Sequence, residues 1–512
     1  MAELLLELFS EEIPARMQAQ AAENLARLLG DTFAALAPAE VRTFYGPRRI
    51  TWTGQIADEV PASSISERGP KLGAPEQALA GFLRKHSASR DDLREEAGYY
   101  LLQKTLPGRP AAALIAEAVP ALLRRFPWPK SMRWGGTSQF TWVRPLRRIL
   151  CLLDGALVPF DLAQGDDDGH GLASDDQTEG HRFLSPGAIT VTGAADYLDR
   201  LRQAHVLADA AERRARVSEG ITARAGEAGY SVVPDEGLLD EVAGLVEWPV
   251  ALLGRIDDDF MSLPPEVRQV SMRVNQRYFA LTDAKGEPAA AFVFAANTVA
   301  PDGGAAIIHG NERVLRARLS DARHFWDLDR NVPLRDRVEA LDRVTFHAKL
   351  GSQGARAARL SGLAGYISQS FGDPDIRIQQ YALEAGKLAK ADLTTGMVGE
   401  FPELQGVMGS YYAGAGGEAS EVVRAIREQY QPKGPGDSVP TDRVSIAVAL
   451  ADKIDLLAGF FAIDEKPSGS GDPYALRRAA LGIIRIIREN GLRLSLRDLL
   501  GVAQGPLLRA LA

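Results

Sequence analysis

The sequence predicts a multidomain α+β protein in which N-terminal mixed α/β lobes precede an all-helical domain. Strand and helix signals alternate over residues 1–330, whereas after Pro333 the apolar residues recur only at helical spacing. The length of 512 residues, with 46% hydrophobic and 25% charged residues, is sufficient for several hydrophobic cores. We therefore predict domains at residues 1–165, 166–330 and 331–512.

Apolar periodicity and residue type predict the elements of the first two domains. Alternating β-branched and aromatic residues, such as Ile50, Trp52 and Ile56, favour a strand. The acidic, glycine-containing segment Gly165–Glu179 is predicted to be an exposed loop between the lobes. The predicted strands begin at Glu3, Ile50, Ala188 and Ala291. The predicted helical stretches are Ala19–Leu29, Ala111–Phe126 and the largely helical Ala194–Ala225.

Apolar stripes at helical spacing predict the third domain. Each stripe places its apolar residues three or four positions apart, which puts them on one face of a helix. A glycine- and proline-rich break at Lys466–Pro473 precedes an arginine-rich helix from Tyr474. The three stripes are Leu334, Val338, Leu341 and Val344; Leu360, Leu363, Ile367 and Phe371; and Ile446, Leu450, Ile454 and Leu457.

Composition excludes several classes of protein. The single cysteine, Cys151, lies in an apolar segment, which excludes a disulfide framework and indicates a buried residue in a reducing compartment. No apolar run is long enough to span a membrane, and Glu7 interrupts the N-terminal apolar stretch, so a signal peptide does not fit. The formal net charge of -8 argues against indiscriminate coating of nucleic acid. We expect a cytoplasmic protein with neither DNA nor membrane as a partner.

The segment Gly310–Asp329 is predicted to be a helix with arginines on the flanks of an apolar stripe. Arginines placed in this way can reach the phosphates of RNA. An intrahelical salt-bridge lattice explains the same pattern equally well, because Glu312 lies four residues before Arg316 and Asp321 three after Arg318. The candidate RNA-binding residues of this helix are Arg313, Arg316, Arg318 and Arg323.

Two shorter segments combine basic and aromatic residues, as surfaces that stack unpaired bases and hold phosphates do. They are FYGPRR from Phe44 and KSMRWG from Lys130. Packing of a turn around Pro47 and burial of an ordinary core tryptophan explain them about as well. The candidate RNA-binding residues of these segments are Arg48, Arg49, Lys130 and Arg133.

Other candidate sites fail on spacing. The acids Asp166–Asp168 lack the ligand pattern of a calcium loop, and Gly469–Asp472 lacks the lysine and hydroxyl that complete a P-loop. No Ser, His and Asp arrangement is evident, and Cys151 has no activating partner in the sequence around it. We therefore predict no catalytic residue and no metal site in this chain.

The run Met397–Ala413, MVGEFPELQGVMGSYYA, is predicted to be helix, turn and helix, with the turn at Gly399–Pro402. Nearly the whole run resembles the beta subunits of two-subunit bacterial glycyl-tRNA synthetases. The resemblance continues from one end of the chain to the other. Further segments similar to the family include LFSEEIPA at Leu8, FYGPRRI at Phe44, KSMRWG at Lys130, GHRFL at Gly180, LVEWP at Leu245, NQRYF at Asn275, GNERVLRARLSDA at Gly310 and DPYALRRAALGI at Asp472.

The resemblance implies a non-catalytic subunit of a glycine–tRNA ligase. In that family a smaller alpha subunit makes glycyl-adenylate from glycine and ATP, with magnesium, and charges the tRNA; the resemblance therefore implies no cofactor on this chain. The implied partners are the alpha subunit, in an α2β2 assembly, and tRNA-Gly, which this chain would bind and position. Gly471 replaces the family's usual lysine before Asp472 and Pro473, and the family's C-terminal anticodon-binding module is expected to be absent.

The family's helical domain resembles a degenerate form of the HD-type metal-dependent phosphohydrolase domain. Such a hydrolase needs histidine as well as carboxylate ligands. Here Ala391 replaces the histidine of the His-Asp pair, and His347 is the one histidine after Pro333. Asp392 and Asp452 are therefore degenerate metal-site positions, predicted to cap helices or form salt bridges. Two alternative functions stay open, an HD-type phosphohydrolase and a scaffold that binds the alpha subunit without touching RNA.

Overall fold

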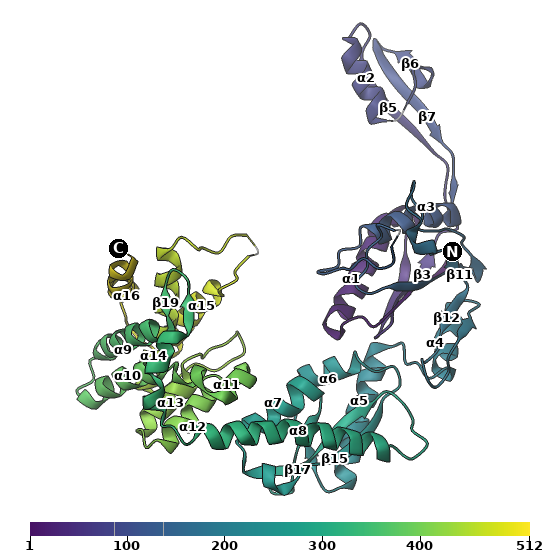
Figure 1. Cartoon of the computed structure of the whole chain (residues 1–512). Coiled ribbons are helices and arrows are strands. Elements are labelled where there is room, and N and C mark those ends of the chain that lie inside the picture. The colour runs from purple at the N-terminus through teal and green to yellow at the C-terminus, as the bar shows by residue number, and fades with distance from the viewer. Residues whose placement is uncertain (87, 137, 470, 512) are drawn as a thin grey trace. The chain divides into compact units, whose positions relative to one another are not determined.

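The structure is a computed structural model that describes residues 1–86, 88–136, 138–469 and 471–511. The chain divides into two units, whose helices and strands are labelled in Figure 1. The sheet unit consists of Met1–Gly254 and Arg277–His309, and the helical unit consists of Arg255–Gln276 and Gly310–Ala512. N-terminal sheets and a mainly helical C-terminal region confirm the predicted α+β class.

The main sheet of the sheet unit has the strand order β10-β9-β1-β3-β2, and β11 pairs in parallel with β9. The central strand β1 is antiparallel to both neighbours, with Leu6 opposite Trp52 on β3 and Cys151 on β9. The strands are β1 (Ala2–Ser10), β2 (Ala39–Tyr45), β3 (Arg49–Ile56), β9 (Leu146–Leu153), β10 (Ala156–Leu157) and β11 (Ser174–Asp175).

Helices cover both faces of this sheet, which explains why β1 is almost continuously apolar. Leu4, Leu6 and Leu8 pack in a core with α1 (Ala15–Thr32) and α3 (Ala111–Arg124). Leu5, on the opposite face, packs in a core with α4 (Ala194–Gln203). Cys151 is buried in the same core as Leu4, Leu6 and Leu8, as its apolar neighbours in the sequence predicted. Burial raises the pKa of its thiol to about 12.

The rest of the sheet unit contains smaller sheets. One is the antiparallel sheet β5-β7-β6 with α2 packed against β5, and another, in the order β14-β16-β17-β15, packs against α5 and α6. The elements are β4 (Glu59–Val60), β5 (Ser63–Lys71), α2 (Glu76–Lys85), β6 (Leu93–Glu96), β7 (Tyr99–Leu106), β8 (Arg109–Pro110), β12 (Gln177–Glu179), β13 (Ala188–Thr190), α5 (Ala210–Glu227), β14 (Ser231–Val232), α6 (Glu236–Ala243), β15 (Val250–Arg255), β16 (Phe279–Thr282) and β17 (Pro288–Ala296).

The stretch Ala194–Ala225, predicted to be largely helical, is confirmed as helical and is divided between two helices. Helix α4 ends at Gln203, and His205 follows with a φ of 60°, outside the right-handed helical region. Asp209 then starts α5 by accepting hydrogen bonds from the backbone N–H groups of Ala211 and Glu212. A chain reversal and a new cap therefore separate the helices.

The helical unit is built around the buried helix α14, which contacts α9, α10, α13, α15 and α16. Its other helices include α8, which belongs to this unit from Gly310 onward, and α7. The helices are α7 (Pro265–Gln276), α8 (Ala305–Asp329), α9 (Gln353–Gln369), α10 (Ile376–Leu388), α11 (Gly396–Glu400), α12 (Val407–Ala415), α13 (Ser420–Glu428), α14 (Arg443–Ala462), α15 (Leu476–Glu489) and α16 (Leu496–Leu511).

The prediction of helix throughout this region is wrong at its start. The stripe from Leu334 falls on two short 3-10 helices, η5 (Leu334–Arg337) and η6 (Glu339–Arg343), and a small hairpin of β18 (Thr345–His347) and β19 (Gly351–Ser352) follows. Leu334 and Leu341 are nevertheless buried, so the apolar spacing did identify core residues.

No helix in the described part of the chain is long and apolar enough to cross a membrane.

Candidate nucleic-acid interface

Arg48 and Arg49 are buried in a polar network inside the sheet unit. Arg48 donates to the Glu247 carboxylate at 2.6 Å and Arg49 donates to Glu7 at 3.1 Å, and the two arginines are 5% and 1% exposed. Burial alone raises the pKa of Glu247, but Arg49 and Arg48 outweigh that effect and hold the pKa below its usual range. Tyr197 also donates a hydrogen bond to Glu7.

This network gives both guanidinium groups internal carboxylate partners. Buried charges are stable only when paired and hydrogen-bonded in this way, so Arg48 and Arg49 are held as structural groups in the folded chain. RNA contact by them stays a prediction that this geometry does not favour. The sequence carried a signal for the network, since Glu7 and Glu247 are single acids within otherwise apolar stretches.

Lys130 and Arg133, in contrast, are exposed on a loop between α3 and β9. Trp134 beside them is only partly exposed, because its ring stacks on His170 with a centroid distance of 4.3 Å. The loop therefore presents its cations to solvent while its tryptophan anchors it, which fits phosphate contact better than base stacking by Trp134.

Asp167 stabilises the same loop through hydrogen bonds to three residues. Its carboxylate accepts from Arg124 Nη1 at 2.9 Å, from Ser138 Oγ at 2.6 Å and from the Gln139 N–H at 3.2 Å. Hydrogen bonds from Ser138 and the Gly169 N–H hold the pKa of Asp167 well below its usual range. This acid therefore has a structural role, and the segment expected to be a simple solvated loop contains the strands β11 and β12 at its end.

The predicted helix with the arginine group is confirmed as α8, and its apolar stripe of Leu315, Leu319, Ala322 and Trp326 is buried. The arginines do not form the intrahelical lattice. Arg316 pairs with Asp257 at 2.6 Å, Arg318 pairs with Glu400 at 3.0 Å, and Arg323 donates to Ser262 Oγ at 2.6 Å. Each of these partners lies on another segment of the helical unit, so sequence spacing within the helix could not reveal it.

Arg313 differs from the other three arginines of α8. It is exposed, and it forms no ion pair with any residue in the described part of the helical unit. An unpaired surface guanidinium can hold a phosphate without first breaking an internal bond. We refer to Lys130, Arg133 and Arg313 as the exposed basic set.

Asp392 and Asp452, which the family resemblance implies are degenerate metal-site positions, have different surroundings. Asp392 is fully buried, and its Oδ2 accepts from the N–H groups of Gly406 at 2.6 Å and Gly409 at 3.1 Å, where α12 begins. Burial raises its pKa to about 6. A side chain at Gly409 would approach this carboxylate to 2.9 Å, and Gly406 has a φ of 80°, so glycine suits both positions.

Asp452 is engaged by cations. Its Oδ1 lies 2.8 Å from Lys390 Nζ and 2.9 Å from Arg356 Nη2. Burial raises the pKa of Asp452, but Lys390 and Arg356 outweigh burial and lower it to about 2. Helix capping by Asp392 and ion pairing by Asp452 are the two roles expected from the sequence, and each engages one carboxylate oxygen of its aspartate.

The run Met397–Ala413 is confirmed as helix, turn and helix. Hydrogen bonds connect it to Asp329, the last residue of α8. Asp329 accepts hydrogen bonds from the N–H groups of Gly396 and Met397, at 3.1 and 2.9 Å, and from the Tyr412 hydroxyl at 3.3 Å. Arg337 completes the cluster with an ion pair to Asp329 at 3.3 Å. This motif is therefore an architectural part of the helical unit.

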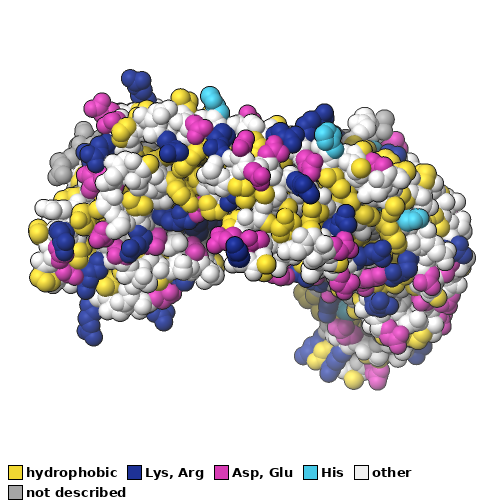
Figure 2. Space-filling model, turned by 90° about the horizontal axis from the view of Figure 1, so that it is seen from below, with side chains coloured by type: hydrophobic (Ala, Val, Ile, Leu, Met, Phe, Trp, Pro, Cys, Tyr) yellow, Lys and Arg dark blue, Asp and Glu magenta, His cyan; other side chains and the backbone are white. Residues whose placement is uncertain are grey.

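Basic side chains are interspersed with acidic ones on the face of the molecule shown in Figure 2, and no single basic field covers it. This distribution fits the formal net charge of -8. Contact with RNA would then depend on local cations within each unit, Lys130 and Arg133 in the sheet unit and Arg313 in the helical unit, since phosphate binding requires positive charge.

Comparison with known proteins gives a consistent result. The family model described as Glycyl-tRNA synthetase beta subunit matches residues 4–507. The Glycine--tRNA ligase beta subunit of Phenylobacterium zucineum is 53% identical over 506 residues, covering 97% of this chain and 74% of the relative. That of Dinoroseobacter shibae is 50% identical, covering 97% of this chain and 69% of the relative. The chain therefore belongs to the glycyl-tRNA synthetase beta subunit family.

Proposed function

We propose that this chain is the tRNA-positioning subunit of a two-subunit glycine–tRNA ligase. The observation that carries the proposal is the match to named beta subunits over residues 4–507. The proposed role is to hold tRNA-Gly so that its terminal adenosine reaches the site where glycine is activated. Such positioning accelerates a reaction by proximity and needs no catalytic side chain on the positioning subunit.

The proposed partner is an alpha subunit that uses ATP and magnesium to form glycyl-adenylate, in an α2β2 assembly in the cytoplasm. This chain itself is proposed to bind no cofactor for that reaction. The name beta subunit carried by the relatives supports a partner chain. The exposed basic set supports phosphate contact, because its three cations face solvent and form no ion pair with the residues that the structure describes.

We further propose that the helical unit derives from an HD-type phosphohydrolase domain that no longer hydrolyses phosphate esters. The surroundings of Asp392 and Asp452 support this proposal, because backbone amides bind one oxygen of Asp392 and two cations bind one oxygen of Asp452. A metal-dependent hydrolase needs carboxylates that face its metal. Measurement of bound transition metal and of phosphodiesterase activity tests it, and we expect neither.

Mixing of purified subunits tests the proposed function. We expect glycylation of tRNA-Gly when this chain and the alpha subunit are combined, and none with this chain alone. Glycylation by this chain alone, or a rate with the alpha subunit alone equal to that of the mixture, would contradict the proposal. The triple variant Lys130→Glu, Arg133→Glu and Arg313→Glu distinguishes a tRNA-positioning subunit from a pure scaffold. A scaffold that does not touch RNA would keep full glycylation activity with those changes.

A further inference from the structure

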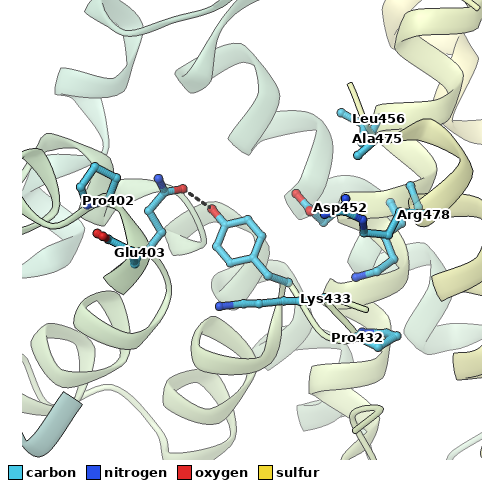
Figure 3. A pocket seen from close by; sticks show the side chains of 12 residues that line it. Pro402, Glu403, Pro432, Lys433, Asp452, Leu456, Ala475 and Arg478 are labelled. Carbon is cyan, nitrogen blue, oxygen red and sulfur yellow. Dashed lines mark hydrogen bonds between the residues drawn. The ribbon is translucent and has the colours of Figure 1, made fainter. Parts of the chain in front are cut away.

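A cavity of about 350 Å³ opens between α14, α15 and the segment that follows α11 in the helical unit (Figure 3). This volume is at the lower end of the range typical of small-molecule sites. The Tyr430 hydroxyl donates to Gln405 Oε1 at 3.3 Å across one wall, as the dashed line in the figure shows. The lining residues are Pro402, Glu403, Gln405, Tyr430, Pro432, Lys433, Asp452, Lys453, Leu456, Ala475, Arg478 and Ala479.

Cationic side chains from three different segments line this cavity. Lys453 lies on α14, Arg478 on α15 and Lys433 on the loop between α13 and α14. Lys433 and Arg478 are exposed, and neither forms an ion pair within the described residues of the unit. Lys453 is buried, and among the described residues its ammonium donates to the neutral carbonyl groups of Gln429 and Gln431, with the shorter contact to Gln431 O at 2.6 Å.

The acids of the lining do not cancel this charge. Asp452 is already neutralised by the ion pairs of its Oδ1 with Arg356 and Lys390 behind the cavity wall. Glu403 is exposed and is the other acid in the lining. The cavity therefore keeps a surplus of positive charge, which favours an anion. The planar guanidinium of Arg478 suits a phosphate geometrically, and the lysines act on it as point charges.

The remaining wall is apolar and is too extensive for an inorganic ion alone. Pro402, Pro432, Leu456 and Ala479 contribute to it, next to the ring of Tyr430. A hydrated ion would leave this wall in contact with water, whereas a base or ribose attached to the phosphate would cover it. Gln405 and Glu403 add polar atoms that can recognise the edge of a base or the hydroxyls of a ribose.

We propose that this cavity binds a nucleotide unit, with its phosphate held by Lys433, Lys453 and Arg478 and its base or ribose against the apolar wall. The site is distinct from the exposed basic set and goes beyond the positioning role. The same chemistry is present in a free nucleoside monophosphate and in an unpaired nucleotide of a tRNA. Competition between the two sources distinguishes them.

Calorimetric titration of the full chain tests the proposal. The probes are AMP, CMP, GMP and UMP, with adenosine as the ligand that lacks a phosphate. We expect saturable binding of at least one monophosphate at one site per chain, and binding of adenosine weaker by about tenfold or more. A tenfold change corresponds to about 1.4 kcal/mol, within the strength of a charge-assisted phosphate contact.

The variant Lys433→Ala with Arg478→Ala is the critical one, because both side chains are exposed and their loss leaves the core intact. We expect it to weaken monophosphate binding by about tenfold or more, at an unchanged melting temperature. Arg488→Ala is the matched control, since Arg488 is an exposed arginine on the same helix outside the cavity lining. Equal monophosphate affinity in the double variant and the control would overturn the proposal.

Competition with tRNA-Gly then identifies the source of the nucleotide. Displacement of the bound monophosphate by tRNA would assign the site to an unpaired tRNA nucleotide, and simultaneous binding would assign it to a free nucleotide. If none of the four monophosphates binds saturably, and the double variant and the control bind tRNA with equal affinity, then neither source occupies the site and the proposal is overturned. Glycylation by the mixed subunits, measured in parallel, reports separately on the proposed function.

Discussion

Asp392 and Asp452 are both buried aspartates of the helical unit, yet their surroundings have opposite effects on their charge. Asp392 accepts hydrogen bonds from backbone N–H groups, and its Oδ1 has no partner among the described residues. Asp452 faces two cations at hydrogen-bonding distance. Burial therefore decides the pKa of Asp392, whereas ion pairing decides that of Asp452.

Replacement of Asp392 by Asn is expected to stabilise the protein at pH 7. The pKa of Asp392 is about 6 in the folded chain, against an ordinary value of 3.8, so folding favours the protonated carboxyl. The stability of the fold relative to the unfolded chain is therefore full below pH 3.8, and part of it is lost as the pH rises through 6 and the buried carboxyl ionises. The penalty above pH 6 amounts to about 3 kcal/mol. Asparagine keeps an oxygen for the Gly406 and Gly409 N–H groups and carries no charge.

Urea unfolding measured between pH 4 and pH 7 checks this expectation. The difference in free energy of unfolding between Asp392→Asn and the unchanged chain should grow as pH rises through about 6, the folded-state pKa of this residue. A variant less stable than the parent at pH 7 would mean that the ionised carboxylate stabilises α12 more than burial destabilises it.

Replacement of Asp452 by Asn is expected to destabilise the helical unit by about 3 to 5 kcal/mol, because Lys390 loses its carboxylate partner inside the core. The stability that Asp452 contributes is present above pH 3.8 and is lost as pH falls through about 2. Thermal unfolding at pH 7 measures the effect. The exposed Asp498→Asn serves as the control, and an equal melting temperature for both variants would contradict the expectation.

At the scale of elements, apolar periodicity predicted where hydrophobic surface is buried more reliably than which backbone geometry buries it. The strands at Glu3, Ile50, Ala188 and Ala291 are confirmed, as is the helix of Gly310–Asp329. The stripe from Leu334 marked buried residues but lies on 3-10 turns. Helical spacing of apolar residues is compatible with both geometries over so short a stretch.

The candidate site was less predictable than the fold, since ion pairing depends on segments distant in sequence. Arg48 meets Glu247 across 199 positions of the chain, and Arg316 meets Asp257 across 59. Basic residues beside aromatic ones gave the same prediction of RNA contact for two segments, whereas the structure has a buried network at Arg48 and an exposed loop at Lys130. Lys433 lies in no motif, and Arg478 lies in the segment DPYALRRAALGI, whose sequence does not show that the two cations line one cavity.

Helix α8 should contribute to tRNA binding mainly through Arg313. Changing Arg313 to Glu removes an exposed cation that has no ion pair in the described structure, so we expect weaker tRNA-Gly binding at unchanged stability. Filter binding at fixed salt measures the affinity, and thermal unfolding measures stability. Arg343→Glu is the matched control, as an exposed arginine of the same unit outside the exposed basic set; equal losses in both variants would reveal a general charge effect.

For the whole molecule, a net charge of -8 means that tRNA binding must come from a few local cations and must be sensitive to salt. Each phosphate contact contributes about 0.7 to 0.9 to the slope of log affinity against log salt concentration. The variant Lys130→Ala, Arg133→Ala and Arg313→Ala is therefore expected to flatten the slope by about 2 to 3 if all three residues hold phosphates. An unchanged slope would show that other residues hold the phosphates, and an intermediate change would count how many members of the exposed basic set take part.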